Sequence, residues 1–173
     1  FSKPYIPLSN DVVNTNFDKV SIYIDNSFSM EADSKNGNLL EVAKNSIPEL
    51  IKAFSPNTEY ILTDNSFSLR NRNKLNKDEL SELNSKIESS AEFKYLSEII
   101  SRQEEFFKED PSKKIRKSQI ILSDFQKSSC DFENLKNNAD VNTILIPLST
   151  QITNNLYIDS CYFETPGRKF QGA

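Results

Sequence analysis

One stretch decides the fold of this chain: Val20-Ser-Ile-Tyr-Ile-Asp-Asn-Ser-Phe-Ser-Met30. Its first half is rich in β-branched and aromatic residues, which predicts a short buried strand. The strand runs into a polar turn in which Asp25, Ser27 and Ser29 occupy alternate positions. A carboxylate followed by two hydroxyls offers the oxygen ligands that a small divalent cation such as Mg²⁺ prefers. The turn therefore predicts a cation site, or else side chains that only cap the next helix and satisfy turn amides.

The composition of the chain limits its class. Its 173 residues suffice for one domain with a core, and 36% apolar with 10% aromatic residues is typical of a soluble globular protein. The net charge of -4 argues against a nucleic-acid surface. One basic cluster, formed by Lys113, Lys114, Arg116 and Lys117, is too local to change this. We therefore expect no nucleic-acid partner.

The chain contains no histidine, which removes several enzyme mechanisms. Ser-His and Cys-His nucleophile pairs and imidazole metal ligands are excluded. Cys130 and Cys161 are too few for a disulfide framework or a zinc cluster, so they form one disulfide in an oxidising compartment or, as we favour, two buried thiols. No run has the length of a membrane span, and the chain opens on Phe1. We expect a soluble segment of a longer protein.

Hydrophobic periodicity divides the remaining sequence into helices and strands. Leu39, Leu40, Ile47 and Ile51 recur at helical spacing, which predicts an amphipathic helix at residues 38–54 after a polar loop at 31–38. Further helices are predicted at residues 78–87 and 95–108, a weaker helix at 131–137, strands at 19–25, 60–63, 119–122 and 143–146, and an edge strand at 67–75. The aromatic residues Phe54, Phe106 and Phe107 fall on apolar helix faces and are predicted to lie in the core.

Short apolar strands that alternate with helices predict an α/β fold, with a doubly wound, mostly parallel sheet and helices on both faces. In such a sheet the carboxyl ends of the strands share one edge, where ligands bind. Asp25, Asp64 and Asp124 each follow a predicted strand, so we expect them to converge there. For Asp64 alone, a surface turn is the alternative to a source of negative potential. We assign residues 1–18 to a surface lead-in, 19–150 to the α/β domain, and 151–173 to the start of a β-rich segment that is cut off.

The turn and the later strands together resemble von Willebrand factor type A (vWA) domains. Residues 25–30 match the Asp-x-Ser-x-Ser motif of that family, and Ser123-Asp124 stands where the family has Thr-Asp-Gly. The helix at 39–54 and the strands at 59–63 and 142–148 follow in the same order as in the family. The resemblance implies a Rossmann-like vWA fold for residues 19–150.

Within the family, the chain is most similar to the membrane-anchored BatA-like proteins of Bacteroidota. Phe1-Ser-Lys-Pro-Tyr-Ile-Pro7 resembles the segment that follows their membrane anchor, and residues 95–103 resemble their central helix. This resemblance implies a parent protein anchored in the inner membrane, with the present domain on the periplasmic face.

The vWA resemblance also implies a metal-ion-dependent adhesion site. In the family such a site holds Mg²⁺ or Mn²⁺, and an acidic side chain of a protein partner completes the coordination. Carried over by position, the metal ligands are Asp25, Ser27, Ser29 and Asp124. The family's threonine has no counterpart in residues 91–94, and Phe28 and Phe125 replace glycines. These departures imply a degenerate site. Phe28, a bulky apolar residue in a polar turn, is either tucked under the loop or offered to a partner.

We predict a non-enzymatic protein-binding module that serves a membrane-associated complex, with no catalytic and no organic-cofactor residues. One alternative is an enzyme that uses strand-end aspartates for phosphoryl transfer or metal-assisted hydrolysis. Against it, Ser27 stands where an aspartyl-phosphate enzyme needs a second carboxylate, and the chain has no Gly-rich phosphate loop. The other alternative is a structural vWA domain with a relic site that never binds metal.

Overall fold

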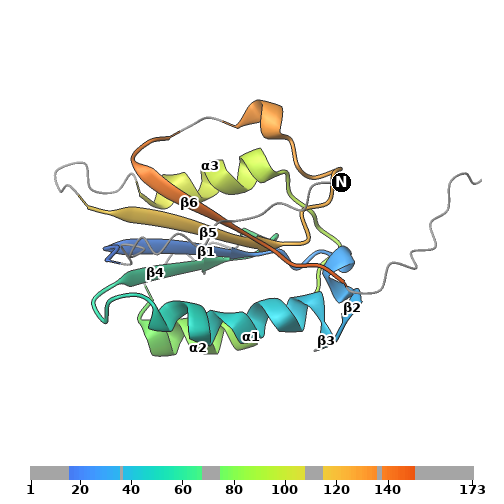
Figure 1. Ribbon diagram of the computed structural model, residues 1–173, viewed down its shortest axis with the longest axis horizontal. Helices are drawn as coiled ribbons and strands as arrows, with labels where there is room; N and C mark the ends of the chain where they lie inside the picture. Colours follow the sequence, from blue (N-terminus) through green and yellow to red (C-terminus); the bar gives the residue numbers. More distant parts are fainter. Residues whose placement is uncertain (1–15, 36, 68–74, 108–114, 136–137, 151–173) are drawn as a thin grey trace, which may run out of the picture.

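A parallel sheet of four strands forms the centre of the computed structural model, which describes residues 16–35, 37–67, 75–107, 115–135 and 138–150 (Figure 1). The strands lie in the order β4-β1-β5-β6. Their bounds are Lys19–Ile24 for β1, Glu59–Thr63 for β4, Lys117–Ser123 for β5 and Val141–Pro147 for β6. This arrangement confirms the predicted parallel α/β sheet.

Most of β1 comes from the stretch at residues 20–30. This strand lies between β4 and β5 and is buried along its whole length. Alternate side chains enter opposite layers of the core: Ile22 and Ile24 belong to one apolar cluster, and Tyr23 to the other. The chain passes from β1 to β4 on one side and then crosses to β5 on the other. The strand order therefore reverses between β1 and β5, and a crevice opens beyond their carboxyl ends.

Helices cover both faces of the sheet (Figure 1). On one face lie α1, Leu39–Lys52, and α2, Lys77–Ser85, while α3, Leu96–Phe106, lies on the other. The buried side of α1 carries the apolar residues whose spacing predicts the helix, and the Asn38 side chain caps it by accepting the Glu41 N–H at 2.8 Å. The predicted core aromatics Phe54, Phe106 and Phe107 are buried.

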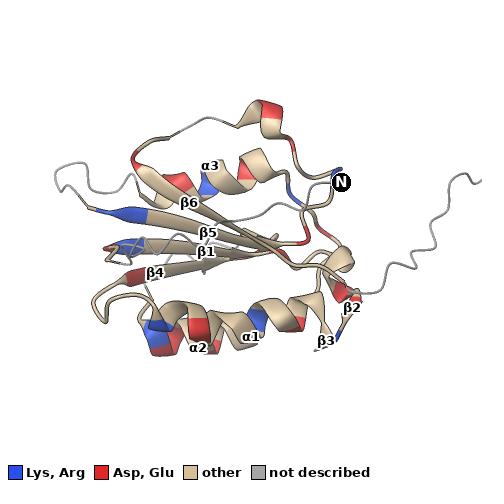
Figure 2. Ribbon diagram, in the orientation of Figure 1, with Lys and Arg blue, Asp and Glu red and all other residues tan. Residues whose placement is uncertain are grey.

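Charge is distributed unevenly between the two ends of the sheet. Lysine begins β1 and β5, at Lys19 and Lys117, whereas Asp25 and Asp124 follow their carboxyl ends. Figure 2 shows the basic residues at the amino ends of these strands. The acidic end is the end at which the crevice opens.

Three local predictions need correction. The predicted polar loop at 31–38 contains regular structure: the end of a 3-10 helix, η1 (Phe28–Glu31), and an antiparallel ribbon of β2 (Asp33–Ser34) with β3 (Gly37–Asn38). Gly37 has φ +104°, a conformation that glycine tolerates. The weaker helix at 131–137 is, in its described part, only a 3-10 turn, η3 (Phe132–Asn134), because no apolar stripe there anchors a longer helix. The last strand, predicted as a buried strand at 143–146, is β6, which is not buried throughout, since among the described strands it pairs only with β5 and its outward side chains are exposed.

Several predictions fall wholly or largely outside the described residues. They concern the lead-in up to residue 15, the edge strand at 67–75, the segment 151–173 and the pairing of Cys161. Cys130 is half-buried and in no disulfide in the described structure. Among the helices that are described, none combines the length and the apolar character that crossing a bilayer requires.

Candidate metal centre

The crevice beyond β1 and β5 contains a cavity of about 430 Å³. Three segments line it: the turn after β1, the loop after β5, and the residues that precede α3. The lining residues are Asp25, Ser27, Phe28, Ser29, Ala91, Phe93, Lys94, Tyr95, Asp124, Gln126, Ser128 and Ser129. All four residues predicted as metal ligands, Asp25, Ser27, Ser29 and Asp124, thus face one space.

The Asp25 carboxylate is nearly buried and is held by three protein donors. One oxygen accepts the Ser27 N–H at 3.0 Å and the Asn65 side-chain amide at 3.2 Å. The other oxygen accepts the Ser123 hydroxyl at 2.7 Å. An ionised carboxylate offers about four lone-pair directions, so one remains for a further donor or for a water bound to a cation.

The hydroxyls of Ser27 and Ser29 lie 3.1 Å apart. Two neighbouring oxygen ligands of an octahedral Mg²⁺, each about 2.1 Å from the ion, are separated by about 3.0 Å. Ser27 occupies the N-cap position of η1, but its side chain makes no capping bond, and α1 is capped by Asn38 instead. Helix capping therefore does not account for these two hydroxyls, although Asp25 does satisfy a turn amide.

Asp124 is half-buried and keeps more unused acceptor capacity than Asp25. One of its oxygens accepts the Gln126 side-chain amide at 3.1 Å. The next residue, Phe125, has φ +47°, a conformation that glycine adopts without strain. A glycine at position 125 would therefore adopt the observed backbone conformation without strain.

The segment before α3 supplies no threonine to the cavity. Ser90 forms a parallel bridge with Ser27 and donates its N–H to the Asn26 carbonyl at 2.7 Å, but it is not among the lining residues. Its hydroxyl accepts the Glu92 N–H at 3.1 Å. The additional aliphatic hydroxyls in the lining come from Ser128 and Ser129, in the loop after β5, which the sequence analysis did not consider.

A hard divalent cation is compatible with this set of donors, with hydroxyl and water ligands in the majority. In the described part of the chain no three His, Cys, Asp or Glu side chains cluster as metal ligands. The lining nevertheless combines two carboxylates with four serine hydroxyls and no nitrogen or sulfur ligand of the kind that zinc prefers. The residues therefore suit Mg²⁺ or Mn²⁺ rather than a softer metal.

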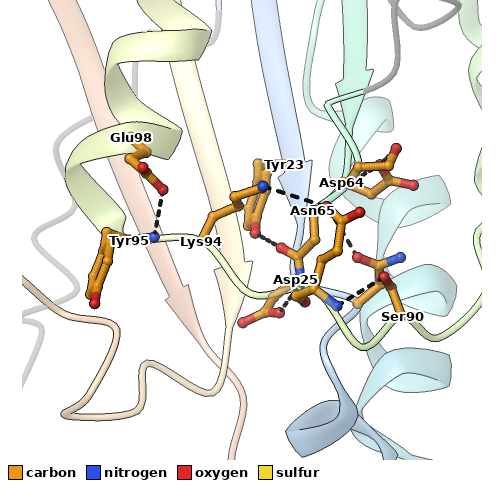
Figure 3. A network of polar contacts seen from close by, with 11 residues as sticks. Tyr23, Asp25, Asp64, Asn65, Ser90, Lys94, Tyr95 and Glu98 are labelled. Carbon is orange, nitrogen blue, oxygen red and sulfur yellow. Dashed lines mark hydrogen bonds and ion pairs between the residues drawn. The ribbon is translucent and has the colours of Figure 1, made fainter.

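Asn65 is a site residue that the sequence analysis missed (Figure 3). It is fully buried; its amide group donates to Asp25 and, at 2.7 Å, to the Glu92 carbonyl, while its oxygen accepts the Tyr23 hydroxyl. Its N–H bonds the Asn26 side-chain oxygen at 3.0 Å. The signal for it is a repeat: Asp-Asn-Ser-Phe occurs at 25–28 and again at 64–67, after neighbouring strands.

Asp64 does not join the other two aspartates in the cavity lining, so the expected convergence holds for Asp25 and Asp124 only. Its carboxylate accepts the N–H of Ser66 at 3.1 Å and the Ser66 hydroxyl at 2.6 Å. These are the bonds of a turn, while the negative potential of the Asp64 carboxylate still reaches Tyr23 beside the site. In the second copy of the repeat it is the asparagine, rather than the aspartate, that reaches the site.

The electrostatics of the site keep the Tyr23 hydroxyl neutral. Burial raises the pKa of Tyr23 above its ordinary value, and the carboxylates of Asp25, Asp64 and Glu98 raise it further. Tyr23 therefore remains a hydrogen-bond donor to Asn65. Lys94, 3.4 Å from a Glu92 carboxylate oxygen, is the one Lys or Arg in the cavity lining.

Two aromatic side chains stand out at the mouth of the cavity. Phe28 is 61% exposed, so the alternative in which it is tucked under its loop is wrong. Phe93 is exposed as well and packs edge-on against Tyr95, with ring centroids 5.5 Å apart.

The comparison with solved structures agrees with this topology. The chain is similar to the crystal structure of the SpRpn10 VWA domain, with a TM-score of 0.52, 12% sequence identity, and coverage of 78% of this chain and 90% of that one. No protein-family model and no curated protein matches the sequence. The fold is therefore the Rossmann-like α/β fold of vWA domains.

Proposed function

We propose that this domain is a non-enzymatic protein-binding module built around a degenerate metal-ion-dependent adhesion site. The observation that carries the proposal is that Asp25, Ser27, Ser29 and Asp124 line one cavity. The separation of 3.1 Å between the two serine hydroxyls supports it further, because it suits adjacent ligands of a small cation.

Each residue has a distinct role in the proposal. Ser27 and Ser29 would bind Mg²⁺ or Mn²⁺ directly through their hydroxyls, and Asp25 and Asp124 would hold it through waters and balance its charge. When bound, the cation supplies a positive centre that recruits an acidic side chain of a protein partner. Ser128 and Ser129 are the candidate replacements for the absent threonine, since they line the same cavity.

A titration with Mg²⁺ and Mn²⁺, followed by calorimetry, tests the proposal. We expect saturable heat from the parent protein and none from the double variant Ser27→Ala/Ser29→Ala, which leaves the buried bonds of Asp25 intact. Asp64→Ala is the matched control, because Asp64 also follows a strand but does not line the cavity; it should bind metal like the parent. Absence of heat from the folded parent would identify a relic site in a structural domain.

We favour binding over catalysis because the chain contains no histidine, and the Ser123 hydroxyl, which bonds the Asp25 carboxylate, is buried. Ser27 also occupies the position at which an aspartyl-phosphate enzyme needs a second carboxylate. Phosphatase and ATPase assays with Mg²⁺ check this assignment. Turnover in the parent that is abolished in Asp25→Asn would favour the enzyme alternative.

We further propose that the domain serves a membrane-associated complex on the periplasmic face of the inner membrane. The support is the resemblance of residues 1–7 and 95–103 to BatA-like proteins. Protease digestion of the full parent protein in spheroplasts tests this. Cleavage of the domain without cell lysis is expected, whereas full protection would contradict the assigned location.

A further inference from the structure

Most of the exposed aromatic side chains in the described residues are concentrated at one place. In the described part of the chain five large apolar side chains are exposed, and three of them, Phe28, Phe93 and Tyr95, line the candidate metal cavity. Their exposed fractions are 61%, 57% and 43%. Scattered apolar residues are ordinary on a protein surface, but a group of aromatic rings around a polar cavity marks an interaction surface.

A second cavity, of about 520 Å³, adjoins the first at Phe28. The two cavities share Phe28, Ser29, Asp124 and Gln126. Beyond these residues the second cavity is lined by Ala32, Leu39, Leu148, Ser149 and Thr150. Together they form a groove across the carboxyl ends of the strands, with apolar walls at both ends and the oxygen ligands in between.

The charge within the groove fixes the kind of group that its centre accepts. Among the described residues, Lys94 is the one Lys or Arg in the lining of the first cavity, and the second cavity has none. A divalent cation held by Asp25 and Asp124 would add positive charge at the centre. An anionic group suits this centre, and large apolar groups suit the aromatic walls on either side.

We infer that the groove binds an extended peptide segment of a partner protein in which one acidic residue is flanked on both sides by large apolar residues. The acidic residue reaches the metal, and its neighbours contact Phe93 with Tyr95 on one side and Phe28 with Leu148 on the other. The inference rests on the proposed function for the metal itself. It adds the specificity for apolar flanks, which comes from residues of this chain.

Fluorescence anisotropy with labelled synthetic peptides tests the inference. The reference probe has the core Leu-Phe-Asp-Phe-Leu between Gly-Ser ends, and three companions replace the aspartate by asparagine, the aspartate by lysine, or all four apolar residues by serine. With Mn²⁺ the reference probe should bind at least about tenfold tighter than the asparagine and serine probes. EDTA should abolish that binding.

Variants of the groove test whether its aromatic side chains bind the probe specifically, or whether any exposed aromatic side chain on the protein surface does so. Phe28→Ser and Phe93→Ser should each weaken the reference probe about tenfold or more while leaving the Mn²⁺ titration unchanged. Phe132→Ser is the matched control, since Phe132 is 58% exposed but lines neither cavity. It should bind the probe like the parent.

The possible outcomes distinguish this inference from the proposed function. If Mn²⁺ binds but the serine-flanked probe binds as well as the reference, or no probe binds, the inference is wrong and the metal site stands. If no Mn²⁺ binds, both fall. Tighter binding of the lysine probe than of the reference probe in the presence of Mn²⁺ would also overturn the inference, because the groove would then be a site for organic cations.

Discussion

Ser123 donates its hydroxyl to the carboxylate of Asp25 at 2.7 Å, and this bond joins the end of β5 to the end of β1. The same hydroxyl accepts the N–H of Phe125 at 3.0 Å. One serine therefore ties together the two loops that carry Asp25 and Asp124. The placement of both carboxylates in one cavity is set by the protein's own hydrogen bonds, before any cation binds.

Replacement of Ser123 by alanine should cost more stability than an equivalent change elsewhere in β5. A bond to a buried charge is stronger than a bond to a carbonyl, so Ser123→Ala should lower the free energy of unfolding by about 2 kcal/mol. Ser118→Ala, which removes a 3.1 Å bond to the Asn142 carbonyl, should cost about 1 kcal/mol. Urea denaturation of both variants measures the difference, and equal losses would contradict the role of the Asp25 charge.

Loss of the Asn65 amide should destabilise the fold strongly. Asn65→Leu leaves the Tyr23 hydroxyl and the Glu92 carbonyl without their partner, and removes one of the three donors to Asp25. We expect a loss of about 3 kcal/mol in urea denaturation. Asn45→Leu, on the exposed side of α1, should change stability by less than about 0.5 kcal/mol. A loss from Asn65→Leu no larger than that of the control would disprove the bridging role.

Glycine should be better tolerated than alanine at position 125. Phe125 has φ +47°, where a side chain costs about 1 kcal/mol relative to glycine. Both variants lose the packing of the Phe125 ring against the cluster around Tyr23. The difference in stability between them therefore measures the cost of the backbone conformation at position 125. Phe125→Gly should therefore be about 1 kcal/mol more stable than Phe125→Ala in urea denaturation. The opposite order, which is usual elsewhere in proteins, would contradict a left-handed backbone here.

Acid should weaken the attachment of the loop after β5 to the start of α3. Hydrogen bonds from the Ser97 hydroxyl and backbone N–H lower the pKa of Asp131 to about 2. Because the unfolded value is about 3.9, the ionised form stabilises the fold above that pH, and the contribution is lost as the pH falls towards 2.

Asp131→Asn should therefore lose less stability than the parent between about pH 4 and pH 2 in urea denaturation. Glu133→Gln, which changes an exposed carboxylate in the same turn, should follow the parent. Parallel stability curves for the parent and Asp131→Asn would show that the ionised Asp131 carboxylate does not stabilise the attachment to Ser97.

The sequence predicts the strands, the main helices and the meeting of Asp25 with Asp124, because apolar periodicity and parallel topology together dictate them. It does not predict that Asn65 rather than Asp64 reaches the site. The tetrapeptide Asp-Asn-Ser-Phe is the same in both places, and only the surroundings of each turn decide which side chain points inward.

Other features depend on neighbours that lie far apart in the chain. Asp131, directly before η3, bonds Ser97, 34 residues earlier, and β6 is partly exposed because nothing described pairs with its outer edge. Phe28 is bulky enough to be core and lies in a turn that leaves it outside. Composition and spacing do not carry such information.

The most direct test of the account is the location of bound Mn²⁺ by paramagnetic broadening of backbone amide signals in NMR. We expect substoichiometric Mn²⁺ to broaden the amides of Ser27, Ser29 and Asp124 first. Those of Lys19, Glu59 and Lys117, at the opposite ends of their strands, should stay sharp. Broadening that begins anywhere else, or that persists in Ser27→Ala/Ser29→Ala, would contradict a metal site between β1 and β5.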